Sequence, residues 1–532
     1  MWTSLRSRVL AVAIYTCAVF ALAFACAPPT LTQEPGPQVK IETGMVEGKM
    51  QGTVHTFLGI PYAASTAGEQ RWKPPAPAPS WSGTRKATEF GPHCMQGAIY
   101  GDMVFHDAGP SEDCLSLNVW TPAKDAGAKL AVMVWIYGGG YMAGATSERR
   151  QDGQFLAKRG VVVVSMNYRL GVFGFLVLPE LAAESGRNSS GNYGLLDQLA
   201  ALQWVHRNIA AFGGDPDNVT IFGESAGSFS VSALMASPLA HGLFVKAIGQ
   251  SGAAFAARGL TFNSLAERKQ SDAEFAKPSL GSTSLKDLRA IPAQKVLDES
   301  LKAGGAKLRF APSVDGYFLP ESVPAIFAAG KENRVSLLAG WNHDENGLLE
   351  NVLNDPPPAA KLQAIAKKNF PNNWQEFLRL YPSGSDSEAT RSLMDFNGDG
   401  FIAWPTWRWL EAAASTGKPV YRYRFDLSLP NDVAGKPDVG AYHSAEIEYV
   451  FGTLDSKTVK PWRAEDRALS DLMQIYWSNF ARNGDPNATG LPVWPVYRAA
   501  DGWPVMHLDV VSKVEKDRQR ERYIFLTSVW GK

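Results

Sequence analysis

The stretch Asn218-Val-Thr-Ile-Phe-Gly-Glu-Ser-Ala-Gly-Ser228 decides how the rest of the chain is interpreted. An apolar, β-branched run, Val219–Phe222, stops at Gly223, where the pattern G-x-S-x-G begins. This order predicts a buried strand, a sharp turn with Ser225 at its apex, and a helix whose N-terminus points at the same place. Gly223 and Gly227 permit such a turn because neither has a Cβ atom to clash. A Gly/Ser turn without chemistry also fits this short pattern, so the rest of the chain must supply partners for the serine.

The composition of the 532-residue chain is that of an ordinary globular protein, with 45% hydrophobic residues. Lysine plus arginine and aspartate plus glutamate both number 52, so the net charge is near zero. This balance argues against a surface dedicated to nucleic acid or to an anionic membrane. No low-complexity linker or internal repeat divides the sequence. We therefore expect one large α/β domain over residues 28–532.

Residues 1–27 are predicted to form a secretory signal peptide. Two arginines precede the apolar run Val9–Ala25, and small residues follow, with cleavage expected near residues 25–27. A retained membrane anchor is the alternative, but the run is short for a span and no second apolar run of about 18 residues follows. Cys26 leaves a lipoprotein anchor open. We expect a secreted or periplasmic protein with no integral membrane segment after cleavage.

Two of the four cysteines lie in or beside the signal, which leaves Cys94 and Cys114 in the mature chain. Two cysteines of an exported protein most simply form one disulfide. It would close a loop of about 20 residues and contribute ~3 kcal/mol. No C-x-x-C pair or His/Cys cluster suggests a metal site. The segment Asp395–Gly400 copies half of an EF-hand loop, but Thr406 stands where calcium needs a bidentate Glu, so we expect neither metal nor cofactor.

Strand and helix patterns alternate along the chain. Helical spacing covers Gly191–Phe212 and Ala464–Arg482, and residues 262–330 look like helices and loops outside the sheet. This order predicts a mostly parallel sheet covered on both faces by helices. The expected buried strands are Leu130–Ile136, Val161–Met166, Val219–Phe222, Phe244–Gln250, Val335–Gly340 and Val420–Phe425.

A glycine loop, Tyr137-Gly-Gly-Gly-Tyr141, follows one of these strands directly. Three glycines let the backbone approach a ligand closely and leave N–H groups free to point at it. An oxyanion hole needs such donors. A flexible loop is the alternative for this segment alone.

Partners for Ser225 are expected downstream, because in α/β-hydrolases the chain order is serine, acid, histidine. His241, His343, His443 and His507 follow the serine. His443 lies in a loop of small residues after a strand, with room for an acid before it, whereas His343 occupies a position suited to the acid. The acid candidates at that strand end are Asp344 and Glu345, and the spacing does not separate them.

Longer motifs resemble the type-B carboxylesterase/lipase family, which also contains the cholinesterases and the non-catalytic neuroligins. The resemblance spans nearly all of the mature chain. It implies an α/β-hydrolase fold whose helical and loop insertions form an active-site gorge. The matching segments include Phe57–Tyr62, Glu112–Asn118, Trp135–Tyr141, Asn167–Leu176, Gly191–Gln198, Gln250–Gly252, Tyr442–Gly452 and Phe480–Pro486.

The resemblance also implies residue roles. Ser225 matches the nucleophile, His443 the base and Glu345 the acid, although Asn346 interrupts the family's D-E-G motif. Gly139, Gly140 and the N–H of Ala226 match the oxyanion donors. Further matches are supporting side chains at Glu224 and Ser251, a disulfide Cys94–Cys114, and buried ion pairs Arg71–Glu112 and Arg169–Asp197.

The expected activity is hydrolysis of small or medium carboxylic esters through a Ser-His-Glu triad and an acyl-enzyme. A neuroligin-like adhesion protein is the rival from another class, but neuroligins lack the nucleophile. A cholinesterase or a specialised natural-ester hydrolase is the other alternative. The loop between Cys94 and Cys114 holds no tryptophan for cation–π contact with choline, although Tyr100 or Phe105 could substitute weakly. The substrate itself and the oligomeric state stay undetermined.

Overall fold

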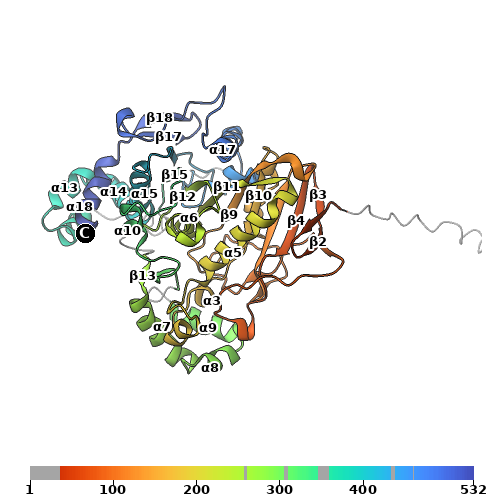
Figure 1. Ribbon diagram of the computed structural model, residues 1–532. Helices are drawn as coiled ribbons and strands as arrows, with labels where there is room; N and C mark the ends of the chain where they lie inside the picture. The colour runs from red at the N-terminus through yellow and green to blue at the C-terminus, as the bar shows by residue number, and fades with distance from the viewer. Residues whose placement is uncertain are drawn as a thin grey trace, which may run out of the picture. The chain divides into compact units, whose positions relative to one another are not determined.

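An eleven-stranded sheet runs through the protein in the order β18-β17-β16-β15-β12-β11-β9-β10-β8-β4-β3 (Figure 1). The computed structural model describes residues 36–256, 261–304, 310–345, 359–432, 438–458 and 460–531, and the predicted signal segment lies outside them. The strands are β3 (Lys49–Gln51), β4 (Val54–Pro61), β8 (Ser116–Thr121), β9 (Leu130–Ile136), β10 (Val162–Met166), β11 (Gly214–Glu224), β12 (Lys246–Gln250), β15 (Ser336–Asn342), β16 (Val420–Phe425), β17 (Pro504–Leu508) and β18 (Lys513–Lys516).

The centre of the sheet is parallel, from β10 through β9, β11, β12, β15 and β16 to β17. Antiparallel strands β8, β4 and β3 continue one edge and β18 the other. The central strands are buried along almost their whole length, as β10 shows with every residue buried. Continuous Val/Ile/Leu runs form such strands because helices cover both faces. The predicted mostly parallel sheet is therefore confirmed.

Adjacent residues of β12 show how the two faces are covered. A Cβ at Gly249 would lie 2.2 Å from the ring of Trp409 on α15 (Trp404–Ala414) and 2.9 Å from Ser228 on α6 (Ala226–Ala236). The next side chain, Gln250, instead accepts a hydrogen bond from Trp477 on α17 (Ala464–Asn483) at 3.0 Å. Successive side chains of a strand point to opposite faces. Helices α6 and α15 therefore pack on one face and α17 on the other.

The remaining helices lie around this layer (Figure 1). The predicted helix 191–212 is α5 followed by a 3-10 turn, Ile209–Phe212, which ends at Gly213 with φ 77°. The helices are α2 (Gln154–Ala157), α3 (Gly171–Phe175), α4 (Pro179–Glu184), α5 (Tyr193–Asn208), α7 (Leu265–Leu280), α8 (Leu285–Ala290), α9 (Ala293–Gly304), α10 (Val323–Ala328), α12 (Ala359–Asn369), α13 (Trp374–Leu380), α14 (Asp386–Gly398), α16 (Ile447–Phe451) and α18 (Arg520–Trp530).

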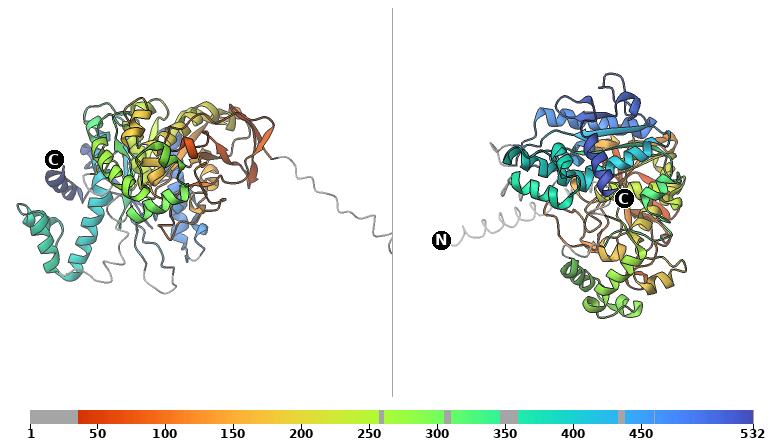
Figure 2. Two further views of the ribbon diagram at one scale, coloured as in Figure 1. Left: turned by 90° about the horizontal axis from the view of Figure 1, so that it is seen from below. Right: turned by 90° about the vertical axis from the view of Figure 1, so that its left-hand side faces the viewer.

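Two groups of helices lie outside the sheet. Helices α7, α8 and α9 gather at one end, as expected for residues 262–330 (Figure 1). Helices α13, α14 and α18 lie together near the C-terminus (Figure 1 and Figure 2). Aromatic rings pack in this group; Phe377 of α13 and Phe396 of α14 meet edge to face with ring centres 5.0 Å apart. The EF-hand-like segment Asp395–Gly400 belongs to α14 and the π-helical turn η6 (Asp399–Ala403) that follows it, so a packed helix replaces a calcium loop.

Short strand pairs complete the structure. Strands β1 (Gln38–Ile41) and β2 (Gly44–Glu47) form an N-terminal hairpin, and β2 also pairs with β5 (Thr84–Lys86). The other pairs are β6 (His93–Cys94) with β7 (Pro110–Ser111) and β13 (Asn263–Ser264) with β14 (Ser313–Val314). Among the described residues, no helix is both long and apolar enough to span a membrane.

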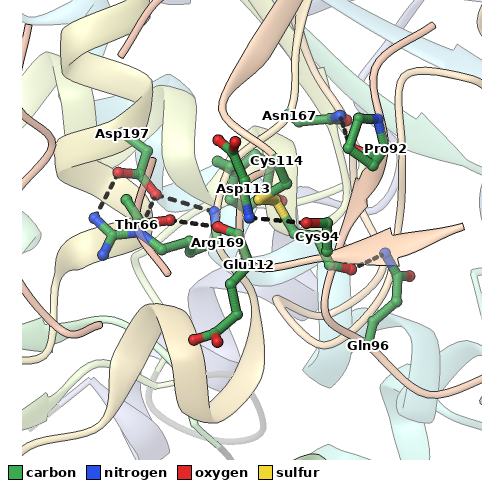
Figure 3. Close-up of a disulfide and its surroundings, with 12 residues drawn as sticks. Thr66, Pro92, Cys94, Gln96, Glu112, Asp113, Cys114, Asn167, Arg169 and Asp197 are labelled. Carbon is green, nitrogen blue, oxygen red and sulfur yellow. Dashed lines mark hydrogen bonds and ion pairs between the residues drawn. A yellow bond between two sulfur atoms is a disulfide. The ribbon is translucent and has the colours of Figure 1, made fainter. Parts of the chain in front are cut away.

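The predicted disulfide and both predicted ion pairs are present. Cys94 and Cys114 are bonded, and Arg169 lies beside Asp197 in Figure 3. The Arg169–Asp197 pair is bidentate at 2.7 and 2.8 Å, with side chains only 4% and 0% exposed. Arg71 and Glu112 form a similar pair at 2.5 and 2.8 Å. These contacts fix the segment that follows β10 and the segment that precedes β8.

Replacing Arg169 by methionine should lower the free energy of unfolding by about 3–5 kcal/mol, because Asp197 would keep a buried charge without its partner. Denaturant unfolding measures this loss. Arg207→Met is the matched control, since its 2.8 Å pair with Glu42 has side chains 49% and 38% exposed. We expect the control to cost less than about 1 kcal/mol. Equal losses in the two variants would refute the assignment of Arg169 as a buried structural charge.

Candidate active site

Ser225 occupies the sharp turn between β11 and α6. Its φ of 53° and ψ of −122° are strained for a residue with a side chain, and its N–H donates to the Gln250 carbonyl at 2.9 Å. A Cβ at Gly227 would lie 2.0 Å from the Ile136 carbonyl oxygen, and one at Gly223 would lie 2.6 Å from the Gly227 backbone. The two glycines thus let the helix start directly against β9. The turn predicted from the sequence is present.

Two side chains that follow other strands complete the arrangement: His443 contacts the serine, and Glu345 contacts His443. His443 follows β16 in the chain, and its Nε2 lies 2.9 Å from Ser225 Oγ. Glu345 follows β15, and its Oε2 lies 2.6 Å from His443 Nδ1. An ionised carboxylate only accepts hydrogen bonds, so Nδ1 carries the proton and Nε2 of the neutral ring is left to accept from the serine hydroxyl. The arrangement is that of a nucleophile, a base and an orienting acid.

Asp344, the rival acid, faces elsewhere. Its carboxylate accepts from Arg391 Nη1 at 2.6 Å and from the Ala441 N–H at 3.0 Å. Burial raises its pKa, but hydrogen bonds from His343 and Arg391 outweigh burial and hold the pKa well below its usual range. Asp344 therefore ties the loop before His443 to the end of β15, and only Glu345 of the two contacts the imidazole of His443.

Ser251 and the backbone of Asn342 hold the acid in place. The Ser251 hydroxyl donates to Glu345 Oε1 at 2.6 Å, and the Asn342 N–H donates to the same oxygen at 2.6 Å. Ser251 directly follows β12 and has a positive φ of 55°. The other carboxylate oxygen is thereby left for His443.

Glu224 lies on the opposite side of the imidazole. Its Oε1 is 3.3 Å from His443 Nε2, and in the described part of the chain this buried oxygen makes no hydrogen bond. Burial raises the pKa of Glu224 to about 8, although His443 lowers it. Burial lowers the pKa of His443, but Glu224 and Glu345 outweigh burial and raise it to about 9. The two flanking carboxylates therefore favour the imidazolium.

Glu224→Gln should shift the rising limb of the pH profile of kcat/KM to lower pH, by about one unit. A general base must be unprotonated, so activity rises with pH as His443 loses its proton. Removing the nearby carboxylate lowers the pKa of His443, and the limb moves in the same direction. Initial rates across pH 5–10 measure the shift. An unchanged limb or a shift to higher pH would contradict the electrostatic role of Glu224.

A further buried carboxylate, Glu446, has no distinguishing signal in the sequence. Gln250 donates to its Oε1 at 3.1 Å and the Asn342 amide donates to its Oε2 at 2.6 Å. The same Asn342 amide nitrogen donates to the Tyr442 carbonyl at 2.7 Å. Burial raises the pKa of Glu446, and the Glu345 carboxylate raises it further. This network joins the ends of β12 and β15 to the segment that carries His443.

The glycine loop lies against the nucleophile. A Cβ at Gly138 would lie 3.0 Å from the Cβ of Ser225, and Gly139 and Gly140 have φ of 94° and 64°. Within the ranges that the structure describes, the N–H groups of Gly139 and Gly140 make no hydrogen bond. Ala226 opens α6, where an N–H has no intrahelical acceptor. The three expected oxyanion donors therefore lie on the two segments that meet at Ser225.

Apolar side chains that the sequence did not single out border the site. The ring of Phe401 lies 5.5 Å from that of His443 and is 37% exposed. It belongs to the π-helical turn η6, an irregularity that often occurs at functional sites. Beside the glycine loop, the Met103 methyl would lie 3.1 Å from a Cβ at Gly139. No group of three or more His, Cys, Asp or Glu in the described residues could hold a metal ion.

A strained serine after a central parallel strand, with a histidine and an acid at neighbouring strand ends, defines a serine hydrolase of the α/β-hydrolase fold. The chain belongs to the carboxylesterase family, whose model matches residues 35–526. It is 35% identical over 486 residues to the fumonisin B1 esterase of Sphingopyxis macrogoltabida, covering 88% of this chain and 87% of that one. It is also 35% identical over 496 residues to the para-nitrobenzyl esterase of Bacillus subtilis, covering 91% and 97%.

The fold agrees with solved structures of this family. A carboxylesterase of Geobacillus stearothermophilus superposes with a TM-score of 0.78 at 35% identity, over 93% of this chain and 99% of that one. The protein is accordingly an enzyme that hydrolyses carboxylic esters.

Proposed function

We propose that Ser225 is the nucleophile, His443 the base and Glu345 the acid of ester hydrolysis. His443 Nε2 removes the proton of Ser225 as Oγ attacks the ester carbonyl. Glu345 stabilises the imidazolium that forms, and His443 then returns the proton to the leaving alcohol. Water repeats the sequence on the acyl-enzyme and releases the carboxylic acid.

The carbonyl oxygen becomes negative in each tetrahedral intermediate. The N–H groups of Gly139, Gly140 and Ala226 are the proposed donors to it. Such donors act only where charge develops, and each is worth about 3 kcal/mol of transition-state stabilisation. Ser251 and Glu224 do not react in this mechanism. Ser251 holds the acid, and Glu224 supports the positive charge on His443.

One observation carries the proposal: the unbroken contact chain from Ser225 Oγ through the His443 ring to Glu345, with steps of 2.9 and 2.6 Å. An adhesion protein on this fold would not need a strained serine in contact with a base. This chain and the named relatives, which are esterases, favour catalysis.

The proposed substrates are small or medium carboxylic esters with apolar groups, because Phe401 and Met103 border the reacting centre. A choline ester fits less well. The loop between Cys94 and Cys114 has no tryptophan, and Phe105 packs on His93 with ring centres 4.9 Å apart. Fumonisin B1, which the name of one relative gives as its substrate, stays a second candidate, since ester hydrolysis is also the reaction proposed here.

A panel of p-nitrophenyl esters of increasing acyl length, with butyrylcholine and fumonisin B1 beside it, tests this proposal. We expect turnover of the aryl esters with the highest kcat/KM at short or medium acyl chains, and little turnover of the choline ester. Preference for the choline ester or for fumonisin B1 would replace the general assignment by a specialised one. Absence of ester hydrolysis throughout would refute it.

Export of the mature domain, residues 28–532, is part of the proposal. The N-terminal sequence pattern supports it, and so does the disulfide Cys94–Cys114, because such bonds persist in oxidising compartments. Mass spectrometry of the protein from the extracellular and periplasmic fractions would show cleavage near residues 25–27, or a lipid on Cys26. An uncleaved cytosolic product would contradict export.

A further inference from the structure

The glycine loop needs external restraint if it is to serve as an oxyanion hole. Gly138, Gly139 and Gly140 are consecutive, and glycine has the largest backbone freedom of any residue. A mobile N–H donor gives little transition-state stabilisation, because electrostatic catalysis depends on dipoles that are already in place. An oxyanion hole built from this loop therefore requires side chains that fix the two ends of the loop.

Tyr168 restrains the start of the loop. It follows β10, the parallel neighbour of β9, and its hydroxyl donates to the Tyr137 carbonyl at 2.8 Å. That carbonyl belongs to the planar peptide that continues as the Gly138 N–H, so one hydrogen bond sets the plane from which the loop departs. The two tyrosine rings stack at 4.5 Å, and the Tyr137 hydroxyl accepts from the Tyr168 N–H at 3.2 Å.

Burial keeps this donor in its useful form. Both rings are completely buried, and burial raises the pKa of the Tyr168 hydroxyl well above its usual value. The hydroxyl therefore stays protonated over the working pH range and continues to donate.

Gln96 restrains the end of the loop. Its Oε1 accepts from the Gly144 N–H at 2.8 Å, and its Nε2 donates to the Gly144 carbonyl at 2.9 Å. The same nitrogen donates to the carbonyl of Cys94 at 3.1 Å, so the amide lies beside the disulfide (Figure 3). Gly144 has a φ of 132°, which a residue with a side chain rarely adopts. The disulfide loop thus reaches the oxyanion loop through one buried amide.

We propose that Tyr168 and Gln96 are positioning residues of ester hydrolysis, which hold the Tyr137–Gly144 loop so that Gly139 and Gly140 can donate to the developing oxyanion. Neither side chain contacts the triad. The inference rests on the proposed function, because it takes these glycines as the oxyanion donors.

Tyr168→Phe and Gln96→Met test the proposal independently, so a folding failure of one leaves the other to decide it. We expect kcat to fall by about 5- to 50-fold in each, less than the 10²- to 10³-fold typical for deleting a donor. KM should change by less than about twofold, because ground-state binding uses the hole weakly. Affinity for an aryl trifluoromethyl ketone, whose adduct with the serine places an oxyanion in the hole, should fall in parallel with kcat.

Tyr476→Phe is the matched control. Tyr476 lies on α17 and is also buried, and its hydroxyl donates to the Pro492 carbonyl at 2.7 Å, a hydrogen bond that involves neither the Tyr137–Gly144 loop nor the segment of Tyr168. We expect a similar loss of melting temperature with unchanged kcat and ketone affinity. The proposal is overturned if Tyr476→Phe lowers kcat as much as Tyr168→Phe, or if the folded test variants retain wild-type kcat. Full activity of Ser225→Ala would instead refute the proposed function.

Discussion

Ser225→Ala is expected to lower kcat for an aryl ester by about 10⁴- to 10⁶-fold, because no acyl-enzyme can form without Oγ. The fold should survive, since the hydrogen bond at this position that fixes the turn comes from the Ser225 N–H and not from the side chain. Initial rates and thermal unfolding of the same preparation separate the two effects.

Ser228→Ala provides the matched control for this variant. Ser228 lies one turn further along α6, is fully buried, and donates through its hydroxyl to the Gly252 carbonyl at 2.5 Å. Its loss should cost about 1 kcal/mol of stability and leave kcat within a fewfold of wild type. Residual activity of Ser225→Ala above about 1% of wild type would contradict nucleophilic catalysis by this residue.

Glu345→Gln is expected to lower kcat by about 10³- to 10⁴-fold. An amide can present its NH₂ group to Nδ1, which favours the tautomer whose Nε2 carries the proton and cannot accept from Ser225. Ser251 and the Asn342 N–H both donate to the Glu345 Oε1 atom, so the amide oxygen is drawn to that side and the NH₂ group toward His443. Steady-state kinetics with one aryl ester measures the loss.

Asp344→Asn distinguishes the two candidate acids. Asp344 pairs with Arg391 and not with the imidazole of His443, so the variant should lose stability while kcat stays within about tenfold of wild type. A larger catalytic loss in Asp344→Asn than in Glu345→Gln would reverse the assignment.

Local patterns were sufficient to predict the core of the sheet. The runs Leu130–Ile136 and Val420–Phe425 are strands with those limits, because apolar, strand-favouring residues bounded by turn residues have few other ways to be buried. The turn at Ser225 could also be predicted, since glycines at 223 and 227 leave space that no other residue leaves. The edge strand β18 is polar and exposed in part and gave no comparable signal.

Spacing alone left the acid as a choice between two candidates, and only the family resemblance pointed to Glu345. Asp344 and Glu345 are adjacent, and which carboxylate meets His443 depends on Arg391, a residue 46 positions beyond Glu345. The motif residues Asn346 and Gly347 lie outside the described residues. Glu446 required the structure as well, because its partners Gln250 and Asn342 come from two separate strands.

Side chains at the rim depend on irregular backbone. Phe401 reaches His443 because α14 ends in a π-helical turn, and no periodicity in the sequence predicts where a helix widens. Tyr168 lies in a matching motif and Gln96 in the loop between the disulfide cysteines, and the role proposed for them in holding the glycine loop follows only from their hydrogen bonds. Substrate preference depends on rim side chains such as Phe401. The sequence therefore predicted the reaction and left the identity of the ester open.

Reaction with an organophosphate, followed by peptide mass spectrometry, decides whether the strained serine is the nucleophile. The wild-type enzyme should lose activity as one phosphoryl adduct forms on the peptide that contains Ser225, and Ser225→Ala should remain unlabelled. Labelling of another residue together with inactivation, or full activity after Ser225 is labelled, would contradict the mechanism.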